Sequence, residues 1–129
     1  MTYKHLMGVL ADLFATTRSL GVKSATLKKD IESLEKLYQD VQESLERTES
    51  EFLELKSKTI ISMDYYTKYQ NCIDREKSLL HSTRENLALS RQLMVGVLRD
   101  IDINKEKLES VSKELSQAEN NVVLIGTKK

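Results

Sequence analysis

The chain of 129 residues contains no proline and no tryptophan, and it has only four glycines. No internal residue therefore bars a helix by lacking a backbone N–H. Aromatic residues make up 5% of the sequence, so a conventional globular core would be poorly filled. These scarcities argue against a compact mixed fold. They favour long helices, for which a composition rich in Ala, Glu, Lys, Leu, Arg, Ser and Gln is typical.

An excess of charge of either sign is also missing. Lysine plus arginine number 20, as do aspartate plus glutamate, and no polybasic block occurs. A nucleic acid or an anionic membrane surface therefore has no electrostatic support as a partner. Purely apolar runs are only a few residues long, whereas a membrane-spanning helix needs about 20. We therefore expect no direct membrane insertion.

The sequence also lacks features of export. Asp12 interrupts the only apolar stretch near the N-terminus, and no cleavage site for a secretory signal follows. The single cysteine, Cys72, cannot form an internal disulfide, which fits a reducing compartment. These observations predict a cytoplasmic protein, either free or peripheral to a membrane-bound complex.

A ladder of residues in alternating steps of three and four runs from Tyr66 to Ile125. This period of 3.5 residues, sustained over many heptads, is typical of a coiled coil. Polar residues at a few ladder positions, such as Asn104, fix register or the number of helices at some cost in stability. We call this ladder the second ladder, because another ladder precedes it in the chain. Its members are Tyr66, Tyr69, Ile73, Glu76, Leu80, Thr83, Leu87, Ser90, Met94, Val97, Ile101, Asn104, Leu108, Val111, Leu115, Ala118, Val122 and Ile125.

A first ladder with the same spacing precedes it, between Leu6 and Leu55. The ladders are separated by the hydroxyl-rich, β-branched residues 57–64, which form the poorest helix segment of the chain. Ser62 or Asp64 would cap a following helix. The members of the first ladder are Leu6, Leu10, Leu13, Thr17, Leu20, Ser24, Leu27, Ile31, Leu34, Tyr38, Val41, Leu45, Thr48, Phe52 and Leu55.

The two ladders predict an all-α fold, a long antiparallel two-helix coiled-coil hairpin. We expect a single elongated domain over residues 1–129, with helices at about 3–56 and 65–123 and a turn at 57–64. An alternative stays open, because the three–four phase continues through residues 55–66 without proline or glycine. One continuous helix in a parallel dimer would also satisfy the pattern. The hairpin is preferred because the weakest helix formers cluster at the midpoint.

Residues with catalytic or ligand-binding potential are isolated in the sequence. His5 and His81 stand alone, and no metal-ligand spacing, phosphate-binding loop or nucleophile motif occurs. A catalytic role for Cys72 would require a water-excluded pocket, which a helical rod does not offer. We therefore predict no enzyme activity, no cofactor and no metal.

The densest aromatic cluster begins the second ladder. Tyrosine is a favoured anchor at protein interfaces, so the sequence predicts a protein-binding surface made of Tyr65, Tyr66, Tyr69, Gln70 and Ile73. The alternative is that Tyr66, Tyr69 and Ile73 only pack within the hairpin, against Phe52 and Leu55. Further apolar residues lie off the second ladder and imply a third or fourth helix from outside: Leu79, Leu89, Leu93, Val95, Leu98 and Ile103.

The segment KTIISMDYYTKYQNCI, residues 58–73, resembles the hairpin turn and second-helix start of the FliJ/YscO (SctO) family of type III secretion. Length and the two-ladder layout are similar over nearly the whole chain. Tyr69 and Ile73 match a surface motif of that family. The resemblance implies a central stalk inserted in a hexameric secretion ATPase, with its protruding end contacting the export gate or chaperones.

A second resemblance concerns about 50 residues. The segment VLRDIDINKEKL, residues 97–108, is similar to the centre of a Qb-type SNARE motif, with Asn104 in the place of the polar central layer. It implies membrane fusion through a four-helix bundle. A structural homodimeric coiled coil is the third hypothesis. We favour the secretion stalk because that resemblance accounts for the whole chain.

Overall fold

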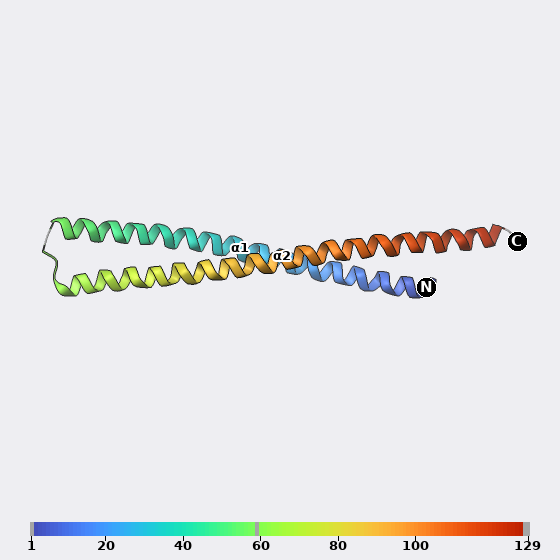
Figure 1. Cartoon of the computed structure of the whole chain (residues 1–129), viewed down its shortest axis with the longest axis horizontal. Coiled ribbons are helices and arrows are strands. Elements are labelled where there is room, and N and C mark those ends of the chain that lie inside the picture. The colour runs from blue at the N-terminus through green and yellow to red at the C-terminus, as the bar shows by residue number, and fades with distance from the viewer. Residues whose placement is uncertain (1, 59, 128–129) are drawn as a thin grey trace. The chain divides into compact units, whose positions relative to one another are not determined.

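The computed structural model describes residues 2–58 and 60–127, and the side chains up to Asn120. Two helices account for nearly all of this chain: α1 spans Tyr3–Lys58 and α2 spans Met63–Thr127 (Figure 1). No strand occurs among the described residues. The two helices pack against each other as a hairpin, which confirms the all-α hairpin. The expectation of one continuous helix is wrong.

The packing falls into two units, each with its own core. The terminal unit comprises Met1–Leu27 and Leu93–Lys129, and the turn unit comprises Lys28–Gln92. In each unit, one segment of α1 packs against one segment of α2 in the opposite chain direction. The expectation of a single domain over 1–129 stays a prediction.

The core of the terminal unit consists of Leu6, Val111 and Leu115, with Val9, Leu10 and Leu13 packed against it. Leu6 is the most buried of these, with 2% of its surface exposed. All but Val9 belong to the ladders predicted from the sequence. Because successive ladder residues fall on one face of a helix, the narrow stripe of each helix meets the stripe of the other.

In the turn unit, the core consists of Leu45, Phe52 and Ile73, with Tyr69 and Leu80 packed against it. Phe52 is the largest of the buried core residues and is 3% exposed. These residues also come from the two ladders. The sequence periodicity therefore identifies the packed face of both helices.

The two buried polar residues of the second ladder, Thr83 and Asn104, both make side-chain hydrogen bonds. The hydroxyl of Thr83 donates to the carbonyl of Leu79 at 2.7 Å, on its own helix. The side-chain amide of Asn104 reaches across to α1, where it donates to the hydroxyl of Thr17 and to the carbonyl of Leu13. The Thr17 hydroxyl in turn donates to the Leu13 carbonyl at 2.9 Å. This layer fixes the register of the two helices, since a shifted pairing would leave the buried amide unpaired.

The helix starts are capped by hydroxyl side chains. The amide of His5 donates to the Thr2 hydroxyl at 3.2 Å at the start of α1. At the start of α2, the amide of Tyr65 donates to the Ser62 hydroxyl at 3.4 Å. Of the two expected caps, the structure therefore uses Ser62. Asp64 instead lies in the first turn of α2, where its negative charge interacts favourably with the positive end of the helix dipole.

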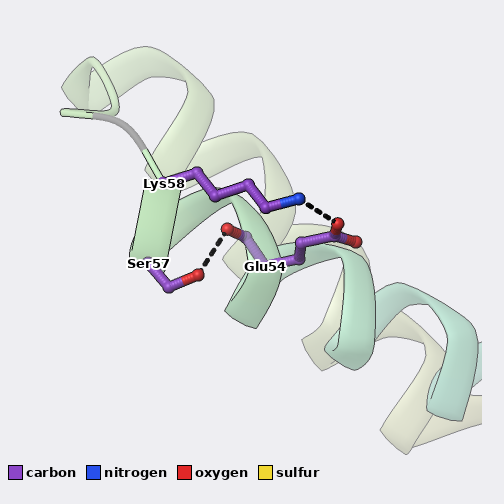
Figure 2. A network of polar contacts seen from close by, with 3 residues as sticks. All are labelled: Glu54, Ser57 and Lys58. Atoms are coloured by element: carbon purple, nitrogen blue, oxygen red, sulfur yellow. Dashed lines mark hydrogen bonds and ion pairs between the residues drawn. The ribbon is translucent and has the colours of Figure 1, made fainter.

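The helix bounds extend beyond those expected. α1 continues past residue 56 to Lys58 because side chains of its last turn bond to groups of the same turn. The Ser57 hydroxyl donates to the Glu54 carbonyl at 2.8 Å and the Lys58 ammonium pairs with the Glu54 carboxylate at 2.7 Å (Figure 2). α2 begins at Met63 rather than Tyr65, and it ends at Thr127 rather than near 123.

The described residues of the turn have ordinary backbone geometry. Residues 60–62 lie outside both helices. Among the described residues, no backbone φ is positive and no peptide bond is cis. The reversal of chain direction therefore requires neither glycine nor proline.

Candidate functional site

Three aromatic rings pack against one another, edge to face, where the hairpin approaches its turn. The ring of Phe52 lies 5.3 Å from that of Tyr66 and 5.4 Å from that of Tyr69, both edge to face. Such pairs contribute about 0.5–1.5 kcal/mol each beyond area burial. The Lys56 ammonium lies 4.1 Å from the centre of the Phe52 ring and 5.1 Å from that of Tyr66. The aromatic cluster thus closes the turn unit at the end of its core.

The five residues predicted to bind a protein have different environments. Ile73 belongs to the core, and Tyr69 is half-buried against Phe52. Gln70 is half-buried and donates to the Asp74 carboxylate at 3.2 Å. Tyr66 is partly exposed, and Tyr65 has 62% of its surface exposed. Packing within the hairpin therefore accounts for the position of Ile73 and for the buried part of Tyr69. Tyr65 is the member most available to a partner. Their binding role stays a prediction.

A groove lies beside Tyr65. It has a volume of about 530 Å³ and is lined by Leu55, Ile60, Ile61, Ser62, Tyr65 and Tyr69. A second groove, of about 420 Å³, shares Leu55 and Tyr69 and adds Glu51, Glu54 and Lys58. The predicted protein-binding surface does not include Ile60 and Ile61, which also line the groove beside Tyr65. The signal for them in the sequence is two consecutive isoleucines in a predicted turn, because a turn exposes its side chains.

The apolar residues predicted off the second ladder, Leu79, Leu89, Leu93, Val95, Leu98 and Ile103, are all exposed, by between 44% and 57%. Leu79 and Leu89 belong to the turn unit. The other four belong to the terminal unit and form the second candidate surface, the off-seam face of α2, which is the part of that helix directed away from the seam. The cores of the two units consist almost entirely of ladder residues, and these exposed side chains belong to neither core.

A carboxylate occupies one ladder position of the turn unit. Glu76 Oε1 accepts hydrogen bonds from the hydroxyls of Ser44 and Thr48, at 3.1 and 3.3 Å, and from the Cys72 thiol at 3.7 Å. Glu76 Oε2 is buried and has no hydrogen-bond partner. The Cys72 thiol is thus a donor to a seam carboxylate. The bonds from Ser44 and Thr48 to Glu76 join α1 to α2 at this layer.

Two further observations bear on the class of protein. No described helix is both long and apolar enough to cross a bilayer. Within residues 2–58 and 60–120, no group of three or more His, Cys, Asp or Glu side chains is placed to hold a metal ion. No model of a known protein family, no curated protein and no solved structure matches this chain. Its function is therefore argued from its own surfaces.

Proposed function

We propose that this protein is a non-enzymatic interaction protein, whose hairpin packs against helices of protein partners through the off-seam face of α2. The observation that carries this proposal is the exposure of the four apolar residues of that face in the terminal unit, Leu93, Val95, Leu98 and Ile103. Exposed apolar side chains that recur along one helix mark an interaction surface. A helix that is apolar nearly all round, as α2 is over residues 93–98, is typically covered on several sides.

In its particular form, the proposal is that the protein is the central stalk of a type III secretion or flagellar export ATPase in the cytoplasm. It would link a hexameric ATPase to the export gate or to chaperones. The supports are the hairpin fold, the residue pattern of 58–73, and an exposed apolar face of the kind that surrounding subunits would cover. The tyrosines Tyr65 and Tyr69 belong to the segment that carries the resemblance.

A second candidate is assembly into a larger helical bundle, either SNARE-like or a homodimer. The off-seam face of α2 favours it, since a bundle would cover the same side chains. The layer around Asn104 argues for the stalk instead. Its amide already finds both acceptors on α1 of the same chain, so no further helices are needed to satisfy it. A polar layer that awaited three other helices would be left unpaired in the single chain.

The test is capture of the purified chain by a hexameric secretion ATPase, with the mass of the free chain measured by light scattering. We expect a monomer that binds the ATPase. The double variant Leu93→Ser/Leu98→Ser should weaken this binding at least tenfold, at unchanged helix content. Val22→Ser is the matched control, because Val22 is equally apolar and exposed but lies on α1.

Two results would contradict the proposal. A stable dimer of the free chain that Leu93→Ser/Leu98→Ser converts to a monomer would assign the face to self-association. A monomer that does not bind the ATPase, but folds into a bundle with membrane-fusion helices, would favour the SNARE-like candidate.

A further inference from the structure

We draw no further inference here: the strongest candidate, the surface patch of exposed apolar side chains around Ile60 and Met63 at the turn between α1 and α2, carries no proposal because nothing in the structure shows what covers it.

Discussion

The terminal unit and the turn unit are built from the same heptad pattern but fix their register in different ways. In the terminal unit, the Asn104 amide donates across the interface to Thr17 and Leu13. In the turn unit, Phe52 holds Tyr66 and Tyr69 through edge-to-face contacts. A buried directional hydrogen bond discriminates among registers at little gain in stability, whereas aromatic packing contributes both.

Their polar seam positions also differ in how completely they are satisfied. The Asn104 amide has two acceptors, while Glu76 in the turn unit keeps one carboxylate oxygen buried without a partner. An unsatisfied buried acceptor is a cost, and a satisfied amide is nearly neutral. The comparison teaches that a polar residue in a coiled-coil ladder can support or weaken its layer, depending on what the facing helix offers.

The largest effect is expected from Phe52→Ala, which removes the main side chain of the turn-unit core. Loss of a buried phenylalanine typically costs about 3–5 kcal/mol. Urea unfolding followed by circular dichroism measures this change. Phe14→Ala is the control, because Phe14 is exposed on α1 and should cost little. Equal losses in both variants would mean that the aromatic cluster does not hold the turn unit.

Asn104→Ala tests the register device of the terminal unit. The variant leaves a cavity and the hydroxyl of Thr17 without its cross-helix donor, so the free energy of unfolding should fall by about 1–3 kcal/mol. Hydrogen exchange should show the loss around residues 6–20 and 101–115, with the turn unit protected as before. Asn86→Ala, on an exposed position of α2, should change neither. A uniform loss of protection would contradict independent register devices.

Glu76→Leu should change stability in the opposite direction. It replaces a carboxylate whose Oε2 is buried without a partner by an apolar seam residue, and we expect a gain of about 1 kcal/mol in the free energy of unfolding. Thr48 keeps its hydrogen bond to the Ser44 carbonyl in the variant. Urea titration of this variant beside Asn104→Leu sharpens the comparison. A loss for Glu76→Leu would show that its hydrogen bonds outweigh the buried oxygen.

The smallest effect is expected from Ser62→Ala, which removes the cap of α2. Loss of a serine cap costs about 0.5–2 kcal/mol, and the long distance to the Tyr65 amide places this case at the lower end. Thermal unfolding detects it as a small fall in Tm. Ser62→Asp should restore most of the stability, since aspartate caps a helix equally well. No difference between alanine and aspartate would exclude a capping role.

The sequence was sufficient to predict the fold, because the 3.5-residue spacing of its ladders identifies the face of each helix that is packed. Ladder residues such as Leu6, Val111 and Ile73 are buried as predicted. Periodicity does not say where a seam ends, however. Leu55 and Tyr66 continue the ladders, yet both are exposed, since the buried core of the turn unit ends at Phe52. The helix bounds at the turn differ from the predicted ones for a related reason. The hydrogen bonds of Ser57 and Ser62 extend each helix toward the turn.

The candidate site was less predictable, because composition identifies side chains that are suited to protein interfaces but not the residues that surround them. Tyr69 and Ile73 were predicted as binding residues, and the structure gives both a packing role. Ile60 and Ile61 lie in the predicted turn, but the sequence does not say which groove their side chains line. The exposed face of α2 could be predicted, because a residue off both ladder positions has no partner within a two-helix seam.

The ordinary backbone geometry of the turn has a consequence for how this protein can change over time. Since none of residues 60–62 has a positive φ, none of them has to be glycine, and most L-amino acids are sterically acceptable there. Substitutions at residues 60 and 61 can therefore change what the end of the hairpin contacts, while both cores stay intact.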